Sequence, residues 1–196
     1  MLLNRNNWLL GITNLGFILA MYTVTFWFPQ AVKEFGFTSW ETGFIVAGPQ
    51  IAGAFAIFLW GRSRRLRDGG PKSLYMPLAV VAASMAVASL GLALSRTWLT
   101  IGALTISTAA IYAAIPAFWT LVTRMIQGAN AAAKIAFVST IGSLSGVIDP
   151  PMVGFIKDHT NSLSGGFAVS TAFLLLAIVT ATFVHSAHRA NSRNAE

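Results

Sequence analysis

Cysteine is absent from the 196 residues of the chain, and charged residues make up only 10% of it. The lack of cysteine excludes a disulfide framework and thiolate chemistry. A soluble domain carries about 25% charged residues, which solvate its surface. The shortage of charge here, beside a hydrophobic share of 55%, indicates that lipid replaces water around most of the chain.

The sequence also lacks the residue clusters that enzymes use. Its three histidines are scattered, with His159 between two apolar runs and His185 and His188 near the C-terminus. No group of His, Asp and Glu has metal-ligand spacing, and no glycine-rich phosphate loop is present. We therefore expect neither an enzyme nor a bound cofactor or metal ion.

Six apolar runs are each long enough to cross roughly 30 Å of hydrocarbon as a helix. The fold expected is an all-α membrane protein, with a single membrane domain over residues 1–196. The first run is too long for the apolar part of a signal peptide and leads directly into the others, so we expect it to be kept as a span. The predicted spans are 8–32, 42–61, 74–94, 98–123, 135–156 and 166–184.

Lysine and arginine are distributed unevenly over the predicted connections. Ten of the 13 fall on the side that holds both termini, while Lys33, Arg96 and Lys157 fall on the other. Because cytoplasmic loops carry an excess of Lys and Arg, we expect both termini in the cytoplasm, at the plasma (inner) membrane. A basic loop, 62–73, and a tail, 185–196, then face the cytoplasm. The net charge of +7 indicates orientation in lipid and not nucleic-acid binding.

Polar and aromatic residues recur at helical spacing in the first, fourth and fifth spans, as in helices that face a water-filled cavity. The row in the fourth span is the longest. Serine and threonine can also bond to the backbone one turn earlier, so a single one means little. The second span has one amide, Gln50, among glycines and a proline that suit either a gate or a close helix contact. The candidate cavity-lining residues are Asn14, Tyr22, Thr25, Gln50, Tyr112, Trp119, Ser139 and Ser143.

The fifth span combines several unusual features. Gly142 and Gly146 form a G-x-x-x-G pair, which permits close approach of another helix. Pro150 and Pro151 remove backbone donors and predict a break or bend at that point. Asp149 precedes them and is the only charged residue within the six predicted spans. Such a group is a candidate proton carrier or cation ligand; alternatively, it caps a helix restarting at Pro150 or lies in the hydrated outer interface.

Two longer strings carry a more specific signal. They are FWFPQAVKEFGFTSWETGFIVAGPQIAGAFAIFLWGR (26–62) and PAFWTLVTRMIQGANAAAKIAFVSTIGSLSGVIDPPMVGFIKDHT (116–160). They resemble the C-terminal half of the major facilitator superfamily and, more narrowly, its anion:cation symporter branch. The resemblance implies one half of a twelve-helix fold, with two inverted three-helix units at 1–94 and 98–184. It also implies that the third and sixth spans lie outside the cavity.

The function that this resemblance implies is proton-coupled transport of a small organic anion, such as a sugar acid or an aromatic or dicarboxylic acid, by alternating access. The implied partners are that anion, a proton, the lipid bilayer and a second six-helix half, either a separate N-terminal chain or a second copy. A non-transporting scaffold or a truncated remnant is the alternative. The chain departs from the family pattern at Asp68, where an acidic residue is displaced, at Ser139 and Ser143, where asparagines are frequent, and at Asp149, where glycine is usual.

Overall fold

The computed structural model describes residues 5–63, 72–128 and 130–193, and these residues form helices joined by short turns, with no strand. Six of the described helical segments are long and apolar enough to cross a membrane, which confirms the expected all-α fold. The fifth of these segments, Ala131–Thr160, consists of two helices with one residue between them. The helices are α1 (Arg5–Glu34), α2 (Ser39–Gly61), α4 (Lys72–Ala93), α5 (Thr97–Met125), α6 (Ala131–Ser143), α7 (Ser145–Thr160) and α8 (Ser164–Arg193).

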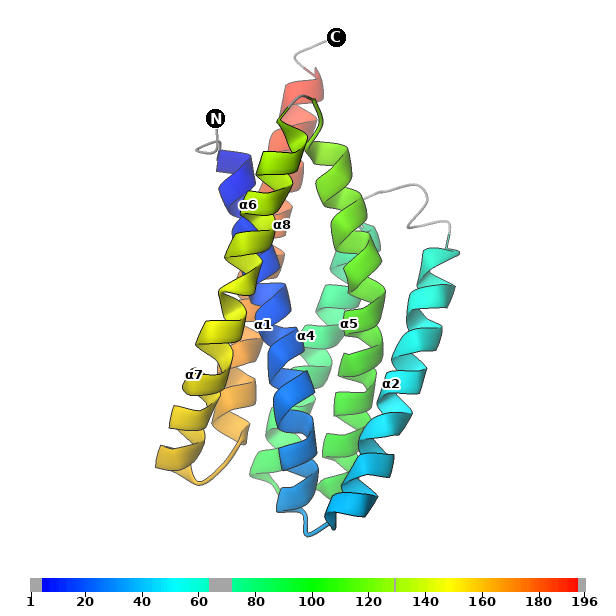
Figure 1. Ribbon diagram of the computed structural model, residues 1–196, viewed down its shortest axis with the longest axis vertical. Helices are drawn as coiled ribbons and strands as arrows, with labels where there is room; N and C mark the ends of the chain where they lie inside the picture. Colours follow the sequence, from blue (N-terminus) through cyan, green and yellow to red (C-terminus); the bar gives the residue numbers. More distant parts are fainter. Residues whose placement is uncertain (1–4, 64–71, 129, 194–196) are drawn as a thin grey trace.

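The helices stand side by side, with α1, α2, α5 and the α6–α7 pair in front and α4 and α8 behind (Figure 1). α1 is the central element, because it contacts α2, α5, α6, α7 and α8. α4 packs on α5 and α8, and α2 packs mainly on α5. The start of α1 and the end of α8 lie at the same end of the bundle, as an even number of spans requires (Figure 1).

The connections between helices follow from local sequence signals. Thr38 and Glu41 form a capping box at the start of α2, in which the Glu41 carboxylate accepts a 2.8 Å hydrogen bond from the Thr38 backbone N–H. Ser95 adopts a left-handed conformation after α4, which lets the Arg96 N–H donate to the Gly91 carbonyl at 2.8 Å. Of the predicted cytoplasmic loop 62–73, residues 64–71 lie outside the described part of the chain, and the predicted tail begins as helix, since α8 continues to Arg193.

Glycines mark the closest contacts of α1 with its neighbours. A methyl group at Gly16 would lie 2.6 Å from the backbone oxygen of Phe173 in α8. The G-x-x-x-G pair faces the other side of α1, where Gly142 lies against Asn14 and Gly146 against Tyr22. A Cβ atom at Gly142 would lie 2.1 Å from Nδ2 of Asn14, and one at Gly146 would lie 3.2 Å from the Tyr22 ring, so a larger residue at either position requires those side chains to move. At Gly16 the neighbour is backbone, so this glycine sets how closely α1 and α8 approach.

The helix interruption in the fifth span lies at Leu144, and the predicted break at Pro150 and Pro151 is wrong in position. Both prolines are inside α7. A proline ring presses on the carbonyl four residues earlier and leaves it without a donor, here the carbonyls of Gly146 and Val147. The backbone changes in the turn just before, where the N–H groups of Val147 and Ile148 both donate to the Leu144 carbonyl, at 3.0 and 3.1 Å. The irregular turn therefore lies upstream of both prolines.

Two of the spans are much less covered than the rest. Only 17% of the α2 span and 22% of the α6–α7 span are buried, against 44–56% of the other four. Large apolar side chains of α2 are exposed, among them Trp40, Phe44, Ile51, Phe55 and Leu59. The front of the bundle therefore has uncovered surface at both of its edges, on α2 and on α6–α7.

Candidate functional site

A cavity of about 240 Å³ lies between α1, α2 and α5. Inside it the Tyr112 hydroxyl of α5 donates a 2.6 Å hydrogen bond to Oε1 of Gln50 in α2. This bond joins two helices across the cavity and orients the Gln50 amide. The described residues that line the cavity are Met21, Val24, Thr25, Gln50, Thr108, Ile111 and Tyr112.

Gly53 makes this arrangement possible. A Cβ atom at Gly53 would lie 2.1 Å from Cδ2 of Tyr112, so the tyrosine ring packs directly against the backbone of α2. Gln50 is three residues earlier, on the same face of α2, and the ring therefore directs its hydroxyl toward the Gln50 side chain. Among the glycines of α2, Gly53 makes a close helix contact, whereas a Cβ atom at Gly43 or Gly48 would meet nothing within 4 Å.

The polar groups free to bind a ligand in the cavity are few and uncharged. Thr108 bonds to the Leu104 carbonyl one turn earlier, at 2.8 Å. The Gln50 amide nitrogen and the Thr25 hydroxyl form no hydrogen bond with the described residues, and Thr25 is exposed. These groups, with the Tyr112 hydroxyl, offer donors and acceptors but no counter-charge. The described lining contains no basic and no acidic residue.

Asp149 lies in a second polar group, away from this cavity. Its side chain is fully buried, and Oδ1 forms a short hydrogen bond with the Thr23 hydroxyl of α1. The Thr23 hydroxyl is also 2.7 Å from the Ser170 hydroxyl of α8 and 3.1 Å from the Leu19 carbonyl. The indole Nε1 of Trp27 faces the same carboxyl group without reaching hydrogen-bond geometry. We call Thr23, Asp149 and Ser170 the carboxyl cluster.

The carboxyl cluster answers the alternatives posed for Asp149. α7 begins at Ser145, four residues before Asp149, and no side chain caps it. Asp149 therefore does not cap a helix starting at Pro150. Full burial also keeps the carboxyl group away from the aqueous surface. Thr23 and Thr25 are about 200° apart around α1, so α1 carries the carboxyl cluster on one face and the cavity on the other.

The predicted cavity-lining residues separate into two groups. Thr25, Gln50 and Tyr112 come together in the cavity. The other predicted residues lie in helix contacts or on the surface. Asn14 donates to the Val138 carbonyl at 3.1 Å, and exposed Ser143 donates to the Ser139 carbonyl at 3.0 Å. Tyr22 stacks on Phe26, and Trp119 meets Phe118 edge to face.

Two residues of the carboxyl cluster have no counterpart in the prediction. Thr23 and Ser170 are buried hydroxyls in apolar runs, and Ser170 belongs to a span without a polar row. In the sequence they stand out only as polar residues. The packing of α1 against α7 and α8 is what buries them. Sequence periodicity does not show which helix will cover a given face, and so could not distinguish them.

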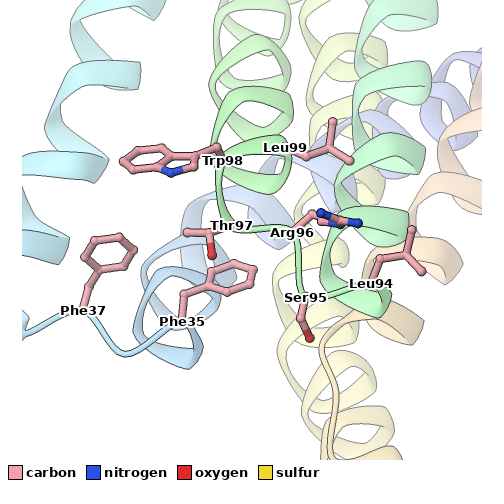
Figure 2. Close-up of a pocket in the computed structure, with 8 residues that line it drawn as sticks. All are labelled: Phe35, Phe37, Leu94, Ser95, Arg96, Thr97, Trp98 and Leu99. Atoms are coloured by element: carbon pink, nitrogen blue, oxygen red, sulfur yellow. The ribbon is translucent and has the colours of Figure 1, made fainter.

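A larger hollow, of about 700 Å³, lies at the end of the bundle between the α1–α2 and α4–α5 connections. Figure 2 shows the rings of Phe37 and Trp98 on one side of it and the Arg96 side chain pointing away from them. The hollow is formed by residues of the two turns, and Arg96, Trp98 and Leu94 are exposed. Because it lies outside the helix bundle, we assign the candidate site to the smaller cavity.

Comparison with known proteins relates the chain to transporters. It is 35% identical over 184 residues, 92% of the chain, to a putative tartrate transporter of Agrobacterium vitis. It is 29% identical over 182 residues to a quinolone resistance transporter of Acinetobacter baumannii, and 30% identical over 152 residues to the inner membrane transport protein RhmT of Escherichia coli.

The chain spans about 40% of the length of the first of these relatives. No family model matches it, and no solved structure matches it. The membrane-spanning helices and the similarity to transporters nevertheless agree. The chain is a multi-pass membrane protein related to proteins that transport small molecules across membranes.

Proposed function

We propose that the chain forms the C-terminal six-helix half of a secondary transporter of the major facilitator type, and that it carries a small organic anion. Thr25, Gln50 and Tyr112 contact the substrate. The observation that carries the proposal is the Tyr112–Gln50 hydrogen bond inside a cavity between three helices. Similarity over 92% of the chain to a putative tartrate transporter supports an organic acid as the cargo.

The cavity recognises the neutral part of such a substrate. Its amide, phenol and hydroxyl groups can bond to hydroxyl and carboxylate oxygens, but the described lining supplies no cation. A carboxylate entering a low-dielectric site needs a positive partner. The positive charge therefore comes from a second six-helix half, which packs beside the poorly covered α2 and α6–α7 spans. That half belongs to the same longer chain, a separate chain or a second copy.

The proposal includes orientation and coupling. The excess of Lys and Arg at the end of the bundle that holds both termini supports a cytoplasmic position for that end, at the inner membrane. Asp149, the one acidic residue inside the spans predicted from the sequence, carries the coupled proton. The anion and the proton then occupy different faces of α1.

A chimera tests the transport function. The segment of the Agrobacterium vitis transporter that matches this chain is replaced by this chain, and uptake of labelled tartrate, sugar acids and aromatic carboxylates is measured in proteoliposomes. The chimera is expected to take up at least one of these acids, and this chain alone none. A chimera that inserts normally and transports none of them would favour a scaffold or a remnant.

Removal of the Tyr112 hydroxyl should weaken substrate binding. In the chimera, Tyr112→Phe loses its hydrogen bond to Gln50 and frees the amide to turn away. A hydrogen bond contributes about 0.5–1.5 kcal/mol, so KM should rise by about 2- to 10-fold. Tyr75→Phe is the matched control, because it removes a 2.9 Å hydrogen bond between α4 and α8, outside the cavity. Equal effects of the two variants on KM would contradict the assignment of Tyr112.

A further inference from the structure

The carboxyl cluster joins three helices that are distant in sequence. Asp149 is on α7, Thr23 on α1 and Ser170 on α8, and all three side chains are fully buried. α7 contacts both α1 and α8, and Figure 1 shows α8 next to α7. α7 has only three buried residues, Ser145, Asp149 and Val153. They are four residues apart, so the carboxyl group is at the centre of the face by which α7 packs on its neighbours.

The hydrogen count at Thr23 favours a protonated carboxyl. A threonine hydroxyl donates one hydrogen bond and accepts two. The Thr23 oxygen has three oxygen neighbours, of which the Leu19 carbonyl can only accept. By geometry the Thr23 hydroxyl is the donor in all three contacts, to the Leu19 carbonyl, to Oδ1 of Asp149 and to the Ser170 hydroxyl, yet it has one hydrogen for the three. A proton on Asp149 supplies the hydrogen of the contact between Asp149 and Thr23. An ionised Asp149 would take the only Thr23 hydrogen and leave the Leu19 contact without one.

The cluster also lacks a counter-charge. On α1, α6, α7 and α8, the described titratable side chains besides Asp149 are Arg5, Tyr22, Lys33, Glu34, Lys134, Lys157, Asp158 and His159. Lys157 is eight residues from Asp149, roughly 12 Å along the helix, and its ammonium pairs with Glu34 at 3.1 Å. Tyr22 faces Gly146 and Phe26. An ionised Asp149 would be a buried charge without a cationic partner, which is strongly unfavourable.

The described residues contain no group of three or more His, Cys, Asp or Glu side chains that could hold a metal ion, and Asp149 is the only carboxylate in the carboxyl cluster. A proton needs no such set of ligands.

We propose that the carboxyl cluster is a proton-binding site that holds α7 against α1 and α8 while Asp149 is protonated and releases α7 when the proton leaves. Loss of the proton places an unpaired charge at the centre of a packing face with only two other buried residues. The irregular turn at Leu144 provides a joint about which α7 moves while α6 stays on α1. This inference deepens the proposed proton coupling and rests on that proposal for its role in transport.

The absence of cysteine allows a direct test. Val153→Cys places one thiol on the buried face of α7, and its reaction with N-ethylmaleimide, which enters membranes, reports release of that face. The reaction is measured in membranes from mildly acidic to mildly alkaline pH, with Asp149 present and in the Asp149→Asn background. At each pH, the labelling rate of the protein that keeps Asp149 is divided by the rate of the Asp149→Asn protein. Because both proteins carry the same thiol, this ratio removes the effect of pH on the cysteine itself.

The ratio is expected to be near one at acidic pH and to rise by more than about tenfold at alkaline pH. Asp158→Asn, which removes an exposed acid of the same helix, should leave the rise intact. A ratio that stays constant over the whole range overturns the inference. If the Val153→Cys protein does not fold, Ser145→Cys tests the same face.

This assay involves no substrate and is therefore independent of transport. If the ratio rises with pH but the protein transports nothing, the proton site is supported and the proposed transport function is wrong. If the ratio is constant but the protein takes up organic acids, the transport function is supported and the proton site is wrong.

Discussion

Uptake driven by a pH gradient is expected to fall to background in the Asp149→Asn chimera, while exchange of labelled for unlabelled substrate across the membrane continues. An asparagine side chain resembles the protonated acid in shape and is always neutral. It keeps α7 against α1 and α8, as the protonated carboxyl does. The carrier with bound substrate can then change between its inward-facing and outward-facing states, which is all that exchange requires. Net uptake also needs the empty carrier to release its proton and return, and asparagine cannot do so.

The measurement compares both processes in the same proteoliposomes, with the pH difference imposed for uptake and absent for exchange. Asp158→Asn serves as the control, since Asp158 is an exposed acid near the end of α7. Loss of both uptake and exchange in Asp149→Asn would show that Asp149 is needed for the structure of the bundle. Retention of both would show that the coupled proton binds elsewhere.

The six spans could be predicted from the sequence because lipid imposes a simple condition. Every backbone polar group must be satisfied within the segment, so a long apolar run becomes a helix whatever its neighbours are. The position of the helix interruption could not be predicted in the same way. The two prolines marked residues 150 and 151 in the sequence, but they lie inside α7 and the interruption is at Leu144, which is itself neither a proline nor a glycine.

The candidate site was predictable only in part. Helical spacing identifies residues that share a face, and it selected Tyr112, which lies where that face of α5 meets α2 and α1 around the cavity. The same reasoning selected Asn14, which lies on a covered face and bonds to the backbone of α6. What covers a face depends on the packing of helices, and glycines such as Gly142 set that packing through contacts with residues more than a hundred positions away.

The backbone contact between α1 and α8 makes Gly16 the glycine whose replacement should cost most stability. In Gly16→Ala the new methyl group would lie 2.6 Å from the Phe173 carbonyl oxygen and 2.8 Å from Cβ of Ala177. A side chain can turn away, but a helix backbone cannot, so α1 and α8 must separate. Such overpacking costs about 1–3 kcal/mol and should lower the melting temperature in detergent by several degrees.

Gly102→Ala is the matched control for this change, because nothing lies within 4 Å of a Cβ atom there and Gly102 is also inside a helix. It should be neutral or stabilising, since alanine favours helix over glycine by about 1 kcal/mol. Equal melting temperatures for the two variants would show that α1 and α8 are not in backbone contact. Because Thr23 and Ser170 meet across the same pair of helices, the separation caused by Gly16→Ala should also raise maleimide labelling of Val153→Cys at acidic pH, where the carboxyl cluster otherwise holds α7 in place.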